Sequence, residues 1–214
     1  MAGLWSVCWP DRRRVVYEGT TAMQFFYRYA ITALWVALGI VWFVAAIGAK
    51  VTRRRETIRS RISHMVPLML AAILLSSRRL AGRYLAIPVL PHGLATFWLG
   101  FMLVLAGIAF SIAARVSLGG NWSGIVTLKQ DHELIRKGPY RLVRHPIYTG
   151  LVVAILGTAI AQGELRSVFA VALVAAALVR KIGIEEALLV QEFGAAYDRY
   201  RREVPALIPF APPR

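Results

Sequence analysis

Charge and cysteine are both scarce in this sequence, and each shortage narrows the class of protein. Charged residues make up 17% of the 214 residues, while hydrophobic residues make up 57%. Water-soluble domains usually carry about a quarter charged residues, so this composition argues against a soluble globular protein. The one cysteine, Cys8, excludes an intrachain disulfide and a metal cluster built on cysteine.

Common catalytic and targeting motifs are missing too. No glycine-rich nucleotide-binding loop follows a predicted strand; residues 119–124 contain glycines, but they follow an apolar run, and we interpret them as a turn at a membrane surface. The arginines within residues 11–14 follow a short apolar stretch instead of preceding it, so no cleaved signal peptide is expected. No serine–histidine–aspartate or metal-binding cluster is apparent, because the histidines are scattered: His64, His92, His132 and His145.

What the chain has instead is long uncharged runs. Residues 30–49 and 93–114 contain no charged residue, and about 20 helical residues cross the ~30 Å hydrocarbon core of a bilayer. We therefore expect one membrane domain over residues 1–214, an all-α, polytopic membrane helix bundle of about five transmembrane helices. The expected helices cover residues 25–49, 65–77, 93–114, 147–162 and 167–179.

Three segments decide the topology of this bundle. The run at 65–77 is brief for a span, so it is expected to be short, tilted or re-entrant. The turn at 163–166 is so short that it permits only an antiparallel helical hairpin. Beyond Val179 the chain is charged and amphipathic, and a cytosolic amphipathic helix is expected to end near Arg202.

Small residues recur on two of the expected helices. Such faces let neighbouring helices approach closely, although glycine is also common in membrane helices without this purpose. The sequence leaves both interpretations open for the first of the two faces. The small residues are Gly93, Gly100, Gly107 and Ala114 in one helix and Gly150, Ala154, Gly157 and Ala161 in the other.

Positive charge is distributed unevenly along the chain. A net charge of +15 would suit a nucleic-acid-binding protein, but the basic residues lie at the ends of apolar runs, which is typical of bilayer anchors. If residues 50–61 are cytoplasmic, inside segments hold 18 of the 26 basic residues and outside segments hold 8. The positive-inside rule then puts residues 115–145 and those after Val179 in the cytoplasm, and no nucleic-acid partner is expected.

A dense group of functional residue types fills residues 138–150, at the start of the fourth expected helix. It contains two prolines, two glycines, two tyrosines, two arginines and one histidine. Pro146 suits the first turn of a helix, and the free N–H groups of that turn could bind an anion beside Arg144 and His145. The alternative is an interfacial cap, in which arginine anchors phospholipid and tyrosine belongs to an aromatic belt.

A second group lies in the charged segment after the last apolar run, where Glu185 and Glu186 are adjacent. Helical spacing puts several residues on one face: Glu186, Val190, Phe193, Tyr197 and Tyr200. The alternative is a solvated amphipathic helix. Because the short hairpin returns the chain to the same membrane surface, His145 and Glu186 are expected to lie close together. A zwitterion with a further positive charge would fit there, and S-adenosylmethionine is one of many such molecules.

The two groups resemble the signature of a known superfamily. Arg144, His145, Pro146, Tyr148 and Gly150 fit the pattern Arg-His-Pro-x-Tyr-x-Gly, and the two glutamates follow one hairpin later. In this order they resemble the isoprenylcysteine carboxyl methyltransferase and phospholipid methyltransferase superfamily, in a prokaryotic form. The resemblance covers about residues 122–210, and the further matching positions are residues 134–140, Phe193, Gly194, Tyr197, Tyr200 and Pro209.

The resemblance implies an integral membrane methyltransferase that uses S-adenosylmethionine on a lipophilic substrate, such as an isoprenylcysteine-type carboxylate. Residues 115–214 would form the cofactor-binding catalytic half, and residues 25–114 the N-terminal membrane helices. The implied catalytic residues are Arg144, Glu186 and Lys181. The implied cofactor-binding residues are Lys137, Gly138, Pro139, Tyr140, His145, Pro146, Tyr148, Gly150, Glu185, Glu186 and Tyr197.

One position departs from the family pattern and leaves the substrate open. The family often has arginine four residues before the first glutamate, where this chain has Lys181, and lysine cannot reproduce a bidentate contact made by arginine. The need for a general base also depends on the substrate. A carboxylate is already ionised at neutral pH, whereas an ammonium or thiol must first lose a proton, which glutamate or histidine could accept.

The expected partners are a lipophilic or lipid substrate and membrane lipids, and the expected location is a prokaryotic inner membrane with the site facing the cytoplasm. Three alternatives stay open. They are N-methylation of phosphatidylethanolamine, methylation of a small apolar thiol, and a non-catalytic membrane accessory protein that retains the fold. A transporter is disfavoured, because no charged residue lies in the middle of any clear span.

Overall fold

The structure is a computed structural model that describes residues 21–47, 52–55, 57–82, 84–119, 127–129 and 134–212. Within these residues the chain forms helices and two short strands, and the all-α expectation is confirmed apart from that strand pair. The helices are α1 (Thr21–Ile47), α2 (Ile58–Ser76), α3 (Arg78–Ala81), α4 (Leu94–Leu118), the 3-10 helix η2 (Gly138–Arg141), α5 (Pro146–Gln162), α6 (Leu165–Phe193) and α7 (Ala195–Glu203). The strands β1 (Thr52–Arg55) and β2 (Thr127–Lys129) pair antiparallel.

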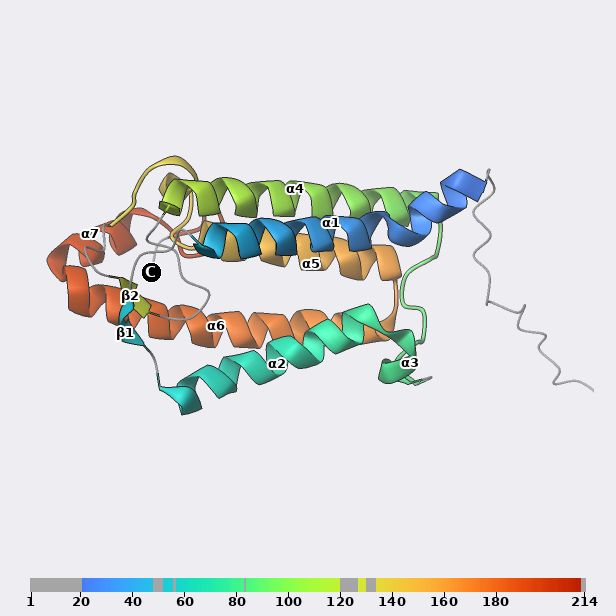
Figure 1. The fold of residues 1–214 in the computed structure, drawn as a ribbon, viewed down its shortest axis with the longest axis horizontal. Coiled ribbons are helices and arrows are strands. Elements are labelled where there is room, and N and C mark those ends of the chain that lie inside the picture. Colours follow the sequence, from blue (N-terminus) through green and yellow to red (C-terminus); the bar gives the residue numbers. More distant parts are fainter. Residues whose placement is uncertain are drawn as a thin grey trace, which may run out of the picture.

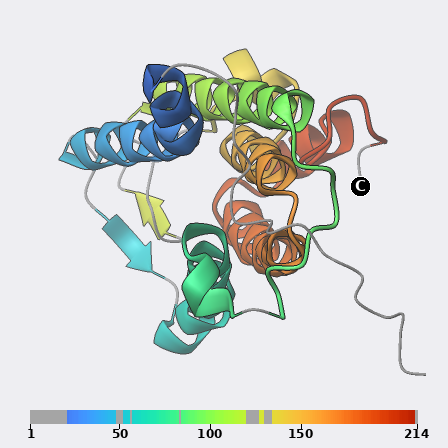
Figure 2. The ribbon, with the colours of Figure 1, turned by 90° about the vertical axis from the view of Figure 1, so that its right-hand side faces the viewer.

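The five long helices run side by side along the long axis of the molecule (Figure 1). Helix α5 lies in the middle of the bundle, between α4 and α6, and α1 covers α4 while α2 covers α6 (Figure 2). Helix α7 and the β1–β2 pair lie at one end of the bundle, and α3 lies at the other (Figure 1). The α5–α6 hairpin therefore connects the two ends of the molecule.

Among the described residues, four helices are long and apolar enough to cross a membrane: Tyr29–Ile47 within α1, and the whole of α2, α4 and α6. Helix α5 is shorter, at 17 residues, and it packs against α4 and α6. Large apolar side chains are exposed on the outer helices, where Phe43 and Ile47 are 74% and 79% exposed. Such surfaces suit a bilayer, and the chain is an integral membrane protein.

The small-residue faces of α4 and α5 pack directly on each other. A Cβ atom added at Gly107 would collide with the backbone oxygen of Gly150, and one at Gly100 would collide with that of Gly157. Close helix approach is thus confirmed as the purpose of both faces. Gly93 is outside this contact, because a Cβ there would meet open space.

The second membrane helix begins earlier than expected. Helix α2 starts at Ile58, so the prediction that residues 50–61 form a loop is wrong for the last four of them. The hydroxyl of Thr57 accepts a hydrogen bond from the Ser60 backbone N–H and caps the helix. Arg59 and Arg61 lie in the first turn, where long basic side chains can reach the membrane surface. The added turns give α2 19 residues, enough to span.

The last membrane helix and the first part of the amphipathic segment form one helix. Helix α6 runs unbroken for 29 residues, because no proline interrupts it beyond Val179. It ends at Gly194, whose φ of +49° favours glycine, and α7 follows at a new angle. The single helical face expected from Glu186 to Tyr200 is therefore divided at this glycine.

Two further sequence expectations concern the connections. The β1–β2 pairing was not predicted, since no alternating apolar pattern marks either strand. The turn expected at residues 119–124 lies outside the described residues beyond Gly119. The antiparallel hairpin expected at residues 163–166 is confirmed: α5 ends at Gly163, with a φ of +60°, and α6 begins at Leu165.

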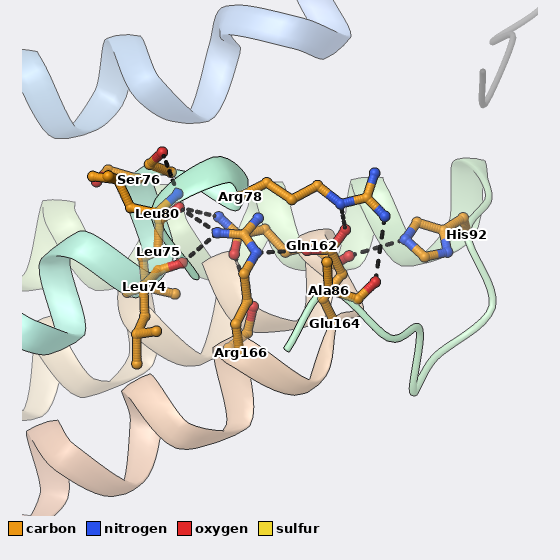
Figure 3. A network of polar contacts seen from close by, with 12 residues as sticks. Leu74, Leu75, Ser76, Arg78, Leu80, Ala86, His92, Gln162, Glu164 and Arg166 are labelled. Atoms are coloured by element: carbon orange, nitrogen blue, oxygen red, sulfur yellow. Dashed lines mark hydrogen bonds and ion pairs between the residues drawn. The ribbon is translucent and has the colours of Figure 1, made fainter. Parts of the chain in front are cut away.

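A polar cluster around the buried side chains of Glu164 and Arg166 closes the end of the bundle at this hairpin turn (Figure 3). We call it the far-end cluster and define it as Arg78, Gln162, Glu164 and Arg166. Glu164 accepts from Arg166 Nε at 2.5 Å through Oε2 and pairs with Arg78 Nε at 3.1 Å through Oε1. Arg166 Nη1 also donates to the carbonyls of Leu74 and Leu75, and Gln162 Nε2 donates to the latter at 2.7 Å. The cluster ties the end of α2 to the hairpin.

Candidate functional site

The sequence motif that ends at Gly150 and the pair Glu185 and Glu186 lie at the opposite end of the bundle from the far-end cluster. Helix η2 and the short segment after it bring the chain to His145, the residue that immediately precedes α5, and Pro146 occupies the first helical position. Tyr140 is buried in a core with Ala114 and Ile147, and its carbonyl accepts a hydrogen bond from the Tyr200 hydroxyl at 2.6 Å. The approach to His145 is thus fixed by α4, α5 and α7 together.

A chain of alternating charges connects this segment to α6. Oε1 of Glu186 accepts from Arg144 Nε at 2.8 Å, pairs with Arg144 Nη2 at 2.8 Å and lies 3.1 Å from His145 Nε2. On the other side of the ring, His145 Nδ1 lies 3.5 Å from Glu185 Oε2. Tyr148 donates its hydroxyl proton to Glu185 Oε1. The expectation that the motif and the two glutamates meet at one surface is confirmed.

The position between two carboxylates sets the protonation state of His145. Burial disfavours its charged form, but hydrogen bonds and charges from Glu185 and Glu186 outweigh burial and raise the pKa above its ordinary value of 6.5. This shift favours the charged form, in which both ring nitrogens carry protons and donate to the flanking carboxylates. A histidine held in this form is a poor proton acceptor near neutral pH.

Lys181 and Tyr148 complete the wall beside Glu185. The Lys181 ammonium lies 5.2 Å from the centre of the Tyr148 ring, a cation–π contact, and the side chain is buried. The rings of Tyr148 and His145 are stacked, with centres 5.6 Å apart and planes inclined by 9°. Lys181, Tyr148 and His145 therefore surround Glu185 with donors and positive charge.

One acceptor and one donor at the site make no hydrogen bond of normal geometry with any described residue, although the two residues approach each other. Oε1 of Glu186 receives all of the contacts from Arg144 and His145, while Oε2 receives none. Nearby, the buried hydroxyl of Tyr197 makes no hydrogen bond of normal geometry to any described residue. Burial, and then the charge of Glu186, raise the pKa of Tyr197, so its hydroxyl remains a donor. A buried polar atom without a normal hydrogen bond, such as the Tyr197 hydroxyl, is rare and points to a ligand.

Two backbone N–H groups just before α5 are taken by the chain itself. The backbone N–H of Arg144 donates to the Pro205 carbonyl at 2.8 Å, and that of His145 donates to the Ala206 carbonyl at 3.0 Å. We call residues 204–207 the C-terminal strap. These two groups precede the helix, so the anion site expected on the N–H groups of the first turn of α5 stays a prediction.

The predicted site residues fall into two sets. The structure brings together seven of them: Arg144, His145, Tyr148, Lys181, Glu185, Glu186 and Tyr197. Lys137, Gly138 and Pro139 lie in and just before η2, and no hydrogen bond or ion pair connects them to the glutamates among the described residues. Pro146 begins α5, Tyr140 belongs to the core, and Gly150 is explained by its packing against Ser111 and Gly107 of α4.

Sequence reasoning missed the strap and Thr149, whose hydroxyl donates to the Leu207 carbonyl at 2.7 Å. Backbone carbonyls of the strap make these contacts, and no residue type marks a carbonyl that accepts. The available signal was Pro205 and Pro209, which end the preceding helix and predict an extended segment.

Comparison with known proteins places these residues in a family context. A model of the isoprenylcysteine carboxyl methyltransferase family matches residues 98–191. The protein-S-isoprenylcysteine O-methyltransferase of Schizosaccharomyces pombe is 38% identical over 117 residues, which are 53% of this chain and 49% of that protein. Protein-S-isoprenylcysteine O-methyltransferase A of Arabidopsis thaliana is 30% identical over 134 residues, which are 59% of this chain and 68% of that protein.

Two other similarities complete the comparison. Methanethiol S-methyltransferase 2 of Bradyrhizobium diazoefficiens is 45% identical over 71 residues, which are 33% of this chain and 26% of that protein. A solved structure of the eukaryotic intramembrane Ras methyltransferase, isoprenylcysteine carboxyl methyltransferase, matches with a TM-score of 0.47 and 24% identity, over 71% of this chain and 51% of that chain. The match thus spans about half the length of the fission-yeast relative.

Proposed function

Because the chain belongs to the isoprenylcysteine carboxyl methyltransferase family, we propose that it transfers a methyl group from S-adenosylmethionine to the carboxylate of a lipophilic, isoprenylcysteine-type substrate. The observation that carries the proposal is the unfilled pair formed by Glu186 Oε2 and the Tyr197 hydroxyl. All residues of the proposed site lie within residues 115–214, the half of the chain expected to be catalytic.

The donors and acceptors at the site suit the amino-acid end of S-adenosylmethionine. Glu186 Oε2 can accept a hydrogen bond from an ammonium group, and the neighbouring Tyr197 hydroxyl can donate to a carboxylate. Glu185 lies on the other side of His145 and adds negative charge for a cation. When bound, S-adenosylmethionine supplies a methyl group already activated by its sulfonium. Arg144 and His145 hold Glu186 by its other oxygen, so its free oxygen has a fixed direction.

The protonation of the site favours a substrate that needs no base. The raised pKa of His145 favours its charged form, which donates from both nitrogens, and each glutamate already accepts hydrogen bonds from protein donors. An ammonium or thiol would have to lose a proton before it attacks, and His145 is poorly suited to accept it. A carboxylate is ionised at neutral pH and attacks without that step. Positioning and exclusion of water would then supply most of the rate enhancement.

The balance of charge favours the same substrate class. The site gathers three cations, Arg144, His145 and Lys181, around two carboxylates, Glu185 and Glu186. One positive charge is left over, which an anionic substrate group can neutralise. Lys181 is a single point charge where the family often has the fork of arginine, so it suits one carboxylate oxygen better than a bidentate contact.

A second candidate function is methylation of a small apolar thiol. The 45% identity to methanethiol S-methyltransferase 2 over 71 residues favours it. The two candidates predict different pH profiles. A thiol substrate reacts as the thiolate, so its rate rises with pH as the thiol ionises, whereas the rate with an already ionised carboxylate stays flat above neutral pH.

We also propose an orientation in a prokaryotic inner membrane with the site in the cytoplasm. The ends of α1 and α4 and the start of α2 lie at the same end of the bundle as the site (Figure 1). The sequence segments assigned to the inside hold 18 of the 26 basic residues, which the positive-inside rule assigns to the cytoplasm. Cysteine labelling on a Cys8-free background tests this, since reagent added outside cells should not reach a cysteine introduced at position 136.

The function is tested by methyl transfer from radiolabelled S-adenosylmethionine to three probes. They are S-farnesyl-N-acetylcysteine, its carboxamide, and an alkyl thiol. We expect label in the first probe only. The carboxamide lacks the nucleophilic carboxylate, and the site offers no suitable base to deprotonate the thiol. Label in the thiol alone would establish the second candidate. No label in any probe, together with no binding of S-adenosylmethionine by folded protein, would exclude a methyltransferase.

A further inference from the structure

The segment after α7 runs along the start of α5, and its successive backbone carbonyls accept hydrogen bonds from polar groups there. The carbonyls of Pro205 and Ala206 accept from the N–H groups of Arg144 and His145. The next carbonyl, of Leu207, accepts from the hydroxyl of Thr149 at 2.7 Å. Three consecutive residues of the strap thus hold the segment that carries the histidine of the site.

The strap and the end of α7 together hold the side chain of Arg144 from the opposite side to Glu186. Arg144 Nη1 donates to the carbonyl of Arg201 at 2.9 Å and to that of Val204. Nε and Nη2 of the same guanidinium face Glu186. Four of its five N–H groups are therefore used within the protein, and the side chain is only 3% exposed. This geometry fits Arg144 as a positioning residue that connects the strap to Glu186. Only one of its five N–H groups is left to bind a substrate.

The contacts have a direct consequence for His145. Its backbone N–H lies just before a proline, outside the hydrogen-bonding of α5, and without the strap it would have no partner there. The strap therefore sets the backbone from which the imidazole projects between Glu185 and Glu186. Thr149 is one turn further along α5 and is the one side chain of that helix that donates to the strap among the described residues.

We propose that residues 204–207, anchored by the Thr149 hydroxyl, are a positioning element that holds His145 and Arg144 against Glu186 for the reaction. This inference rests on the proposed function for its catalytic consequence only. The strap adds no chemistry of its own. The strap fixes the position of the Glu186 carboxylate oxygen that is proposed to bind the cofactor. Loss of the strap contact loosens the pair of His145 and Glu186 without unfolding the helices.

The test compares three variants of the full-length protein. Thr149→Val removes the donor with little change in volume, and Thr149→Ser restores it. Thr158→Val is the matched control: Thr158 is a buried threonine of the same helix that donates to the Ala154 carbonyl at 2.9 Å and accepts from Trp35, far from the site. Any general effect of removing a threonine hydroxyl from α5 appears in this control as well.

Two readouts do not depend on activity. Hydrogen exchange reports on the N–H groups of Arg144 and His145, and NMR of labelled histidine reports on the titration of His145. We expect Thr149→Val to speed this exchange about tenfold and to shift the His145 titration toward lower pH, while Thr149→Ser and Thr158→Val stay near wild type. Binding of S-adenosylmethionine should weaken about threefold to tenfold in Thr149→Val only.

The possible failures are distinguishable. If Thr149→Val lowers the melting temperature but leaves both the exchange and the His145 titration at wild-type values, the strap is merely structural and the inference is overturned. If Thr149→Ser fails to restore them, the hydroxyl is not the anchor. If the wild-type protein binds no S-adenosylmethionine, the proposed function fails, while exchange and titration still decide whether the strap holds the pair.

Discussion

Both ends of the α5–α6 hairpin hold a buried arginine paired with a glutamate, but the two glutamates differ in how their oxygens are used. At the far end, Glu164 uses both oxygens, one for Arg166 and one for Arg78. At the site, Oε1 of Glu186 contacts both Arg144 and His145, whereas Oε2 makes no hydrogen bond of normal geometry to a described residue. An arginine–glutamate pair therefore uses both carboxylate oxygens at the far end but only one at the site.

The difference separates a structural ion pair from a binding site. Burial of an arginine–glutamate pair is common to both ends and does not itself indicate function. What marks the site is an unused carboxylate oxygen beside the unpaired hydroxyl of Tyr197 and next to a histidine with a raised pKa. The far-end cluster has saturated partners and fits a role in holding α2 against the hairpin.

The largest expected effect comes from breaking the far-end pair. In Glu164→Gln the guanidinium of Arg166 loses its charged partner while it stays buried, which typically costs about 3–5 kcal/mol. We expect a large fall in the free energy of unfolding, measured by thermal and denaturant unfolding in detergent. Affinity for S-adenosylmethionine at a temperature where the protein is folded should stay within about twofold of wild type, since the cluster does not touch the site. A stable variant with weak binding would contradict this division of roles.

The next effect is a pH-dependent loss at the site. His145→Gln removes a cation that donates to two carboxylates, and we expect it to cost about 2 kcal/mol of stability at low pH. Because the folded-state pKa of His145 is raised above 6.5, its contribution is fully present below pH 6.5 and is lost as the pH rises through the raised value. The melting temperatures of wild type and variant should therefore converge with increasing pH. A constant or widening gap would show that the imidazolium is not what stabilises the site.

The smallest effect is expected at Lys181. Lys181→Met removes the ammonium from the Tyr148 ring and from the vicinity of Glu185, and should weaken binding of S-adenosylmethionine about fivefold, or about 1 kcal/mol. Lys181→Arg keeps the cation and should stay within about twofold by calorimetry. Equal losses in both variants would mean that the shape of lysine matters and its charge does not.

Much of the fold could be predicted because it rests on patterns that are local in sequence. Uncharged runs predicted α1 and α4, and the short turn predicted the hairpin that unites His145 with Glu186. The start of α2 could not be predicted from hydropathy, because arginines near Ile58 belong to the helix but reach the membrane surface. The length of α6 was missed for a similar reason. Charged residues after Val179 mark the end of the apolar run, but no proline there ends the helix.

The candidate site shows the same limit at atomic scale. Residue types indicated a carboxylate pair beside a histidine, and the structure brings them together. Which oxygen of Glu186 is free depends on the direction of the Arg144 side chain, which the carbonyls of Arg201 and Val204 determine. Gly150 looked like part of the binding motif, yet its contact with α4 explains it without a ligand.

The central claim is that the free oxygen of Glu186 receives S-adenosylmethionine, and calorimetric titration of three proteins tests it most directly. In Glu186→Gln, the amide oxygen can keep the contacts of Arg144 and His145, but an NH2 group replaces the acceptor Oε2. We predict that wild type binds, that Glu186→Gln binds at least about tenfold more weakly, and that Glu164→Gln binds like wild type despite its lower stability. Absence of binding by folded wild type, or equal weakening in the two variants, would contradict the claim.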